Sequence, residues 1–242
     1  MKKILAFTLA ETLIVMGIIG IVSALTLPNL NSSTANKEKV VKLKKLYQNL
    51  DDAFGRAQAV YGPVDEWFIN DSAGANQITR FAQRMSEFMK ITKDCGIGTG
   101  VGCVTQDDAK YFDGSGDPDG PYNWDGDYKV LLADGASLNF FLNNNKITIH
   151  VDIDGPNKGA NAWNKELFAF EIDRTSVGPK IIEPVGKNLT DAQLTSQCFT
   201  PTNDSGACTA WVIQNENMDY LKATKGKCTN NTVLSWTNTT CK

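Results

Sequence analysis

The chain has 242 residues and nearly balanced charge, with 24 Lys and Arg against 27 Asp and Glu. No block of one sign is long enough to indicate nucleic acid as a partner, so none is expected. The length fits one ordinary domain together with a separate N-terminal segment.

The N-terminal segment is a long uncharged stretch headed by one acid. After Lys2 and Lys3 the next charge is Glu11, and the one after that is Lys37. A carboxylate in an apolar stretch of membrane length costs about 2.5–3.5 kcal/mol at a bilayer centre and less near an interface. Because something must offset that cost, Glu11 is a candidate functional residue.

The residues around Glu11 form a motif with a defined spacing. It consists of Ala6-Phe7-Thr8-Leu9-Ala10-Glu11, the apolar run that follows and Pro28. This motif resembles the N-terminus of type IV prepilins and of the pseudopilins of type II secretion systems. The chain departs from the family at Ala6, where glycine is usual, and at Ala10, where a large aliphatic residue is usual. Alanine is small enough for a narrow peptidase pocket, so cleavage is still expected.

The resemblance implies a role for each residue of the motif. A prepilin peptidase would cut between Ala6 and Phe7, and the new N-terminus at Phe7 would be methylated. Glu11 would pair with the free amine of Phe7 in a neighbouring subunit during assembly, and Pro28 would bend the helix. The implied partners are the prepilin peptidase, other pilin or pseudopilin subunits, the inner-membrane assembly platform and the membrane itself.

Two other interpretations of this segment are a secretory signal and a plain membrane anchor. Val22-Ser23-Ala24 offers a small-x-small cleavage site for the first. Neither interpretation explains an acid inside the apolar run.

Hydrophobic periodicity predicts one long helix over 12–61, bent near Pro28 and ended by Gly62-Pro63. Its first half is apolar on all sides. Its second half has apolar residues three and four positions apart and needs a partner surface. Five lysines occur within 37–45. We interpret them as a solvated face, or as contacts to lipid headgroups or to acids of a neighbouring subunit. The predicted division is a leader over 1–6, a transmembrane and assembly helix over 7–30, and an extracytoplasmic head over 31–242.

The rest of the chain predicts a second helix and an antiparallel sheet. The helix covers 75–93, and the glycine-rich segment 95–103 after it is predicted to be a loop closed by a disulfide. Strand patterns follow at 128–141 (with a hairpin turn at Asp134-Gly135), 146–154, 167–172 and 179–185. The expected fold is α+β and pilin-like. A long N-terminal helix with a transmembrane first half packs on an antiparallel sheet, and a disulfide-stapled C-terminal lobe follows.

Six cysteines lie beyond the apolar segment, and none forms a CxxC pair. With a single histidine in the chain, zinc ligation is poorly supported, and disulfides in an oxidising compartment are favoured. Six cysteines allow fifteen pairings. Sequence proximity favours Cys95–Cys103, Cys198–Cys208 and Cys228–Cys241.

Two acid-rich turns are candidate calcium sites. Asp152, Asp154 and Asn157 provide oxygens in one turn. The second group is Asp113, Asp117, Asp119, Asp125 and Asp127. Calcium binds six to eight oxygens in such loops, but Asp, Asn and Gly also make ordinary turns without an ion. Apart from calcium at these turns, no cofactor is expected.

His150 alternates with apolar neighbours, so it is expected to point away from the core, at the surface. No Ser/His/Asp or Cys/His arrangement can be formed around it. The sequence therefore nominates no catalytic residue, and an enzyme is not expected.

Two parts of the head also resemble uncharacterised prepilin-type proteins of bacteria, namely 151–157 followed by 167–172, and 208–222. The expected function is that of a structural subunit, a pilin, minor pilin or pseudopilin of a type IV pilus or type II secretion filament. The alternatives are a tip-located minor pilin that binds a surface or substrate, and a membrane-anchored enzyme, for which no polar pocket can be assembled. The expected location is the inner membrane, crossed once with the head outside, and then an extracellular or periplasmic filament.

Overall fold

A computed structural model describes residues 9–68, 74–106, 108–121, 126–143, 145–202 and 205–241, without the side chains of 23–33, 108 and 117–121. The chain divides into two compact units, one up to Glu38 and one from Lys39 onward. The fold is α+β, with an antiparallel sheet and disulfides, as predicted at that level.

Helix α1 (Leu9–Tyr61) is the longest element and changes character along its length. Apolar side chains fill its first turns, whereas charged residues are frequent from Lys37 onward, so it is not an apolar helix throughout. Over the residues that the structure describes, no helix combines the length and the apolar character needed to cross a membrane. This finding overturns the expected single-pass inner-membrane location.

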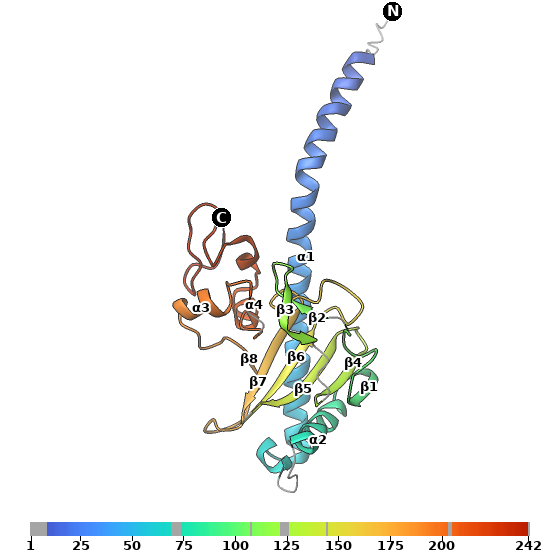
Figure 1. Cartoon of the computed structure of the whole chain (residues 1–242), viewed down its shortest axis with the longest axis vertical. Helices are drawn as coiled ribbons and strands as arrows, with labels where there is room; N and C mark the ends of the chain where they lie inside the picture. The colour runs from blue at the N-terminus through green and yellow to red at the C-terminus, as the bar shows by residue number, and fades with distance from the viewer. Residues whose placement is uncertain are drawn as a thin grey trace, which may run out of the picture. The chain divides into compact units, whose positions relative to one another are not determined.

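The main sheet is antiparallel and has the strand order β1-β4-β5-β6-β7-β8 among the described residues. From β4 onward, neighbours in the sheet are also neighbours in sequence, and short turns connect β4 to β5 and β5 to β6 (Figure 1). The strands are β1 (Ile91–Ile97), β4 (Tyr128–Leu132), β5 (Ser137–Asn143), β6 (Lys146–Asp152), β7 (Leu167–Asp173) and β8 (Glu183–Pro184). The predicted hairpin turn at Asp134-Gly135 lies between β4 and β5.

One face of the sheet packs against the part of α1 that begins at Lys39. Residues of this part spaced three and four apart are buried in one core with alternate residues of the strands. The helix residues are Val40, Leu43, Leu46, Leu50, Ala53, Phe54 and Ala57. The Tyr47 ring stacks on that of Phe170 in β7, with centroids 5.2 Å apart. The two periodicities of the sequence, about 3.6 and 2, therefore meet in one hydrophobic core.

The predicted second helix is shorter than expected. Helix α2 (Gly74–Ser86) ends before a turn, and Ile91 to Ile97 form the edge strand β1 instead of helix and loop. Two register shifts interrupt the pairing of β1 with β4. A short 3-10 helix, η1 (Val64–Phe68), precedes α2 and buries Trp67 against it.

The second face of the sheet is covered by the long loops of the chain. A two-stranded sheet, β2 (Asp108–Lys110) with β3 (Gly116–Pro121), lies in one of these loops. A second small hydrophobic core connects β2 with the start of β7 and with the loop before it. It consists of Val104, Ala109, Trp163 and Leu167. The sequence predicted neither β2 nor β3.

The C-terminal lobe contains α3 (Asp191–Gln197), α4 (Thr209–Asn215) and the 3-10 helix η2 (Asp219–Lys222). Thr190 caps α3 in a capping box with Gln193. Phe199, Trp211 and Tyr220 are fully buried, so this lobe has an aromatic core of its own.

All six cysteines are paired as predicted from sequence proximity. The bonds are Cys95–Cys103, Cys198–Cys208 and Cys228–Cys241, and no cysteine is free. Structural disulfides are typical of oxidising compartments.

Candidate functional site

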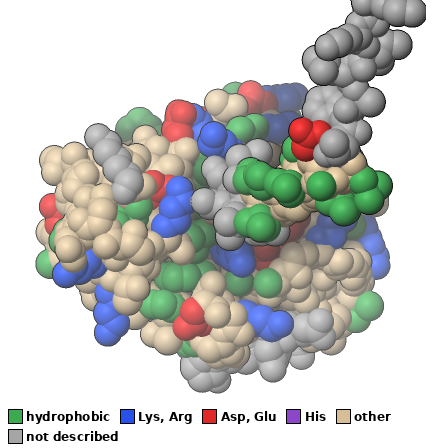
Figure 2. Space-filling model, turned by 90° about the horizontal axis from the view of Figure 1, so that it is seen from above, with side chains coloured by type: hydrophobic (Ala, Val, Ile, Leu, Met, Phe, Trp, Pro, Cys, Tyr) green, Lys and Arg blue, Asp and Glu red, His purple; other side chains and the backbone are tan. Residues whose placement is uncertain are grey.

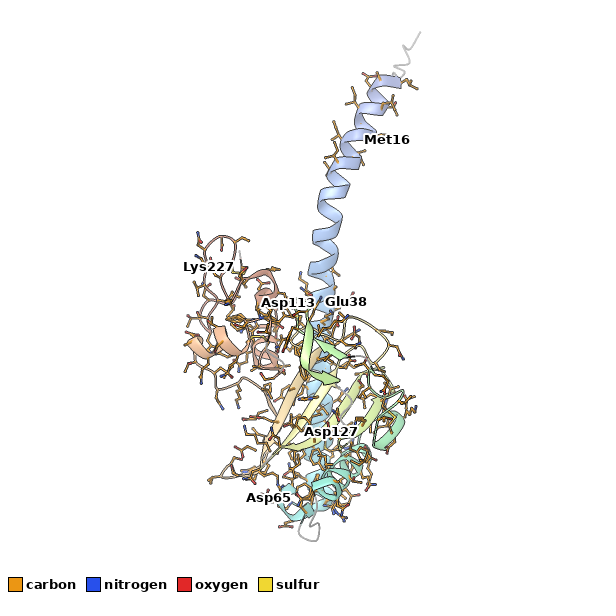
Figure 3. All side chains as sticks on the ribbon, in the orientation of Figure 1. Met16, Glu38, Asp65, Asp113, Asp127 and Lys227 are labelled. Atoms are coloured by element: carbon orange, nitrogen blue, oxygen red, sulfur yellow. A yellow bond between two sulfur atoms is a disulfide. The ribbon has the colours of Figure 1, made fainter. Side chains whose placement is uncertain are left out.

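The first candidate site is the apolar segment of α1 from Leu9 to Val22. Its nine large hydrophobic side chains are all more than half exposed, from 51% for Val15 to 82% for Leu9. They are Leu9, Leu13, Ile14, Val15, Met16, Ile18, Ile19, Ile21 and Val22. Figure 3 shows side chains, among them the labelled Met16, standing out from this part of the helix.

The exposed side chains encircle the helix. Leu13, Ile14, Val15 and Met16 are consecutive, and successive residues of an α-helix point about 100° apart, so these four face all directions. An ordinary amphipathic helix has an apolar stripe on one side only. This segment is therefore apolar on every side and needs to be covered on every side.

Glu11 lies in the first turn of α1 and is exposed. A carboxylate in the first turn interacts favourably with the helix dipole. Of the other predicted motif residues, Ala6 and Phe7 lie outside the described residues. Pro28, the predicted site of a bend, falls within α1, and its side chain is not among those described.

The lysines that follow form ion pairs within the chain. Lys39 pairs with Glu166, Lys44 with Glu216, and Lys45 approaches Asp134 at 4.0 Å. Three of the five lysines in 37–45 thus bind acids of their own chain rather than only facing solvent. On the face shown in Figure 2, Lys and Arg are intermixed with Asp and Glu.

The Lys39–Glu166 pair is the most enclosed of these ion pairs. The Lys39 ammonium donates to Glu166 Oε1 at 2.7 Å, and only 5% of the Glu166 side chain is exposed. Its Oε2 accepts the backbone N–H of Ala160 at 2.7 Å and, at 3.4 Å, that of Ala162. Burial raises the pKa of Glu166, but Lys39 and these donors outweigh it, so the net pKa is lowered. Glu166 therefore stays ionised and ties its loop to α1.

A buried lysine lies on the second face of the sheet. Lys129 of β4 is fully buried, and its ammonium donates to the carbonyls of Gly98 at 2.7 Å and Asp127 at 3.0 Å. Asn139 donates to Asp127 Oδ2 at 2.8 Å. Burial raises the pKa of Asp127, opposed by the Asn139 bond and the Lys129 charge. These contacts fix the 95–103 loop on the sheet.

The expectation that His150 is a surface residue was wrong. It does point away from the α1 core, but its ring is only partly exposed, 4.6 Å from that of Phe141 and 4.8 Å from that of Trp163 between centroids. Burial among these rings lowers the pKa of His150 to about 3. The loop that carries Trp163 covers it, which strand alternation alone could not indicate.

The second candidate site is the acid turn at the end of β6. Asp152 is fully buried, and its Oδ1 accepts the backbone N–H of Asp154 at 3.2 Å and of Gly155 at 3.0 Å. Burial, with the adjoining Asp154 carboxylate, raises the pKa of Asp152 to about 8. Asn157, the third predicted calcium ligand, is exposed. The structure thus brings the carboxylates of Asp152 and Asp154 together, one of them fully buried, whereas Asn157 is exposed.

The other acid-rich turn is an ordinary turn where it is described. Asp113 is exposed, and its Oδ1 accepts the backbone N–H and the hydroxyl of Ser115. The side chains of 117, 119 and 125 are not described, and Asp127 is buried beside Asn139. Within the described part of the chain, no three His, Cys, Asp or Glu residues gather around one point that could hold a metal ion.

Comparisons of the chain with protein-family models, with curated proteins and with solved structures give no match.

Proposed function

We propose that this protein is a structural subunit of a type IV pilin-like filament, in which the apolar segment of α1 packs against the same segment of other copies. The observation that supports this most is the ring of nine exposed apolar side chains between Leu9 and Val22. Fully burying one large apolar side chain contributes about 1.5–3 kcal/mol, so covering nine contributes on the order of 10 kcal/mol or more. Such a segment favours an assembled state.

The arrangement of these side chains favours several neighbours over one. A single partner helix covers one stripe, whereas this segment is apolar all round. A bundle of such helices covers every side. Subunits joined head to tail form an open helical filament when the rotation does not close a ring.

Glu11 supports the same proposal through its charge. In a bundle of apolar helices its carboxylate would be buried, and a buried charge is stable when it has a partner. We propose cleavage between Ala6 and Phe7 by a prepilin peptidase, with N-methylation of Phe7. The amine of that processed residue in a neighbouring copy would then pair with Glu11 and set the stagger of the subunits.

The remainder of α1 is anchored in the head, which is consistent with a subunit that presents its N-terminal segment for assembly. From Val40 to Ala57 its apolar face belongs to the core of the head, and Lys39 and Lys44 pair with acids outside the helix. Three disulfides close loops of the same unit. From Val40 to Ala57, α1 is therefore held by the hydrophobic core of the head. This suits a pilin, a minor pilin or a pseudopilin.

The test compares Glu11→Ala with the matched control Glu38→Ala, which removes the next acid of the same helix, also exposed. Both proteins are expressed beside an intact assembly machinery, and sheared filaments are assayed by immunoblot against total protein. We expect the filament fraction to fall at least tenfold for Glu11→Ala and to stay within twofold for Glu38→Ala. Normal incorporation of Glu11→Ala into filaments would contradict the assembly role of Glu11. An equal fall of the filament fraction in both variants would mean that removing any acid of α1 has this effect.

A further inference from the structure

Three buried side-chain oxygens without a hydrogen-bond partner meet at the acid turn after β6. Asp152 Oδ2 and Asp154 Oδ1 are buried and accept no hydrogen bond from the described residues. The same holds for the hydroxyl of Ser137, which is fully buried at the start of β5. Orphaned polar atoms of this kind are uncommon in folded proteins and call for a reason.

The three oxygens belong to neighbouring side chains. Ser137 and Asp152 are direct partners in the β5–β6 register, so both side chains stand on the same face, with Cβ atoms about 5 Å apart. Asp154 follows two residues later, and its carboxylate interacts with that of Asp152. The buried Ser137 hydroxyl without a partner is therefore an observation separate from the pair of acids.

The turn is held in place by its backbone. Asp152 Oδ1 is fixed by two backbone N–H donors, which leaves Oδ2 directed away from them. Gly155 has φ +88, and a Cβ added there would lie 2.1 Å from the carbonyl oxygen of Gly135. The β4–β5 turn thus packs tightly on the acid turn, and neither turn can shift far.

Two carboxylates that face each other in a buried place need a positive charge between them. Buried charges in proteins are paired or coordinate metals. Among the described residues, the ion pairs involve neither Asp152 nor Asp154, so no lysine or arginine supplies that charge. The repulsion between the two carboxylates is therefore relieved either by a proton that they share or by a bound cation.

We propose that a calcium ion binds between Asp152 and Asp154, with the Ser137 hydroxyl as a third ligand. Carboxylate and hydroxyl oxygens are hard donors, and calcium accepts six to eight oxygens in irregular geometry. Asp154 is partly exposed although its Oδ1 is buried, so water from the side of this residue would complete the coordination of the ion. Magnesium requires a near-ideal octahedron and loses its water reluctantly, so this asymmetric site disfavours it. Asn157, which is exposed, has no part in the proposed site.

The test uses the full-length protein, purified in detergent and freed of metal with EDTA. Calcium chloride is titrated calorimetrically, and thermal unfolding is followed with and without calcium. We expect one calcium per chain, a higher melting temperature with calcium, and at least tenfold weaker binding of magnesium. Asp152→Asn should weaken calcium binding at least tenfold. The matched control Asp113→Asn removes an exposed acid in a similar turn and should stay within twofold.

A second pair of measurements separates binding from folding. In EDTA, Asp152→Asn should unfold at or above the wild-type temperature, because one of two facing carboxylates is gone. Ser137→Ala should fold normally and weaken calcium binding several-fold. If Asp152→Asn does not fold, the calcium affinities of Ser137→Ala and Asp154→Asn test the proposal in its place. If the wild-type protein binds no calcium at millimolar concentration, the proposal is overturned, and Asp152 and Asp154 share a proton instead. Binding as tight in the Asp152 and Ser137 variants as in the wild type would also overturn it.

Discussion

The ammonium of Lys39 lies 2.7 Å from the carboxylate of Glu166, a residue 127 positions further along the chain. Lys39 belongs to α1, and Glu166 ends the loop that covers the second face of the sheet, directly before β7. The carboxylate also receives backbone N–H groups of that loop. One buried ion pair therefore connects the helix with the loop that holds Trp163 over His150.

Removing the cation of this pair should destabilise the head. Lys39→Met leaves the Glu166 carboxylate buried without its counter-charge, and breaking a buried pair costs about 3–5 kcal/mol. Lys39 is itself 16% exposed, so we expect a loss near the lower end, about 3 kcal/mol. Chemical denaturation measures it. The control Lys42→Met changes an exposed lysine of the same helix and should stay within about 0.5 kcal/mol. Equal stability of the two variants would mean that the pair contributes little.

His150 should make the protein lose stability in mild acid. Its pKa is about 3 in the folded protein, against about 6.5 when unfolded, so only the unfolded chain takes up a proton between these values. The contribution is therefore complete above about pH 6.5 and is lost as the pH falls toward 3. Because the ring is partly exposed, the loss at pH 5 is at most roughly 2 kcal/mol.

The measurement for His150 is the free energy of unfolding between pH 7 and pH 4.5, for the wild type and for His150→Phe. The buried acids titrate in both proteins, so the difference between the two curves isolates the histidine. We expect that difference to grow below pH 6.5 in favour of the variant. Parallel curves would contradict the lowered pKa.

The sequence predicted those elements whose cause is local. Apolar residues at helical spacing identified the face of α1 that packs on the sheet, strand patterns located β6 and β7, and short spacing identified the disulfides. It failed where a distant segment decides the outcome. Strand alternation predicts that His150 lies at the surface, but the loop that carries Trp163 covers its ring.

The same limit applies to the polar residues of the sheet. Lys129 and Ser137 alternate with core residues along their strands, but strand alternation does not tell whether loops cover the second face of the sheet. The extension of the second helix to 93 failed for a related reason. Ile91 pairs with Leu132 in the sheet, and that long-range pairing outweighs the local helical pattern.

The three disulfides should differ in how readily they are reduced. Both cysteines of Cys198–Cys208 are fully buried, whereas Cys95 and Cys241 are partly exposed. Thiol–disulfide exchange requires access of the attacking thiolate. We therefore expect Cys198–Cys208 to be the last pair labelled when the native protein is treated with increasing dithiothreitol and alkylated, with peptide mapping as the readout. Simultaneous labelling of all three pairs would indicate global unfolding before reduction.

Gly155→Ala should be strongly destabilising. The residue has φ +88, and the added Cβ would lie 2.1 Å from the Gly135 carbonyl oxygen, a backbone atom that cannot move aside cheaply. We expect a loss of about 2–3 kcal/mol or more in free energy of unfolding, from strain and overpacking together. In Gly126→Ala, the control, the added Cβ meets none of the described residues within 4 Å, so stability should hardly change. A Gly155 variant as stable as this control would show that the two turns are not tightly packed.

The filament proposal is tested most directly by crosslinking within assembled filaments. A photoreactive amino acid is placed at Met16, in the middle of the apolar segment, or at the fully exposed Val177 of the head as the control. Sheared filaments are irradiated, and crosslinked peptides are identified by mass spectrometry. We predict that Met16 crosslinks to residues 9–22 of another copy, whereas Val177 does not reach that segment. Filaments that contain the protein but give no crosslink from Met16 to a second copy would contradict the account.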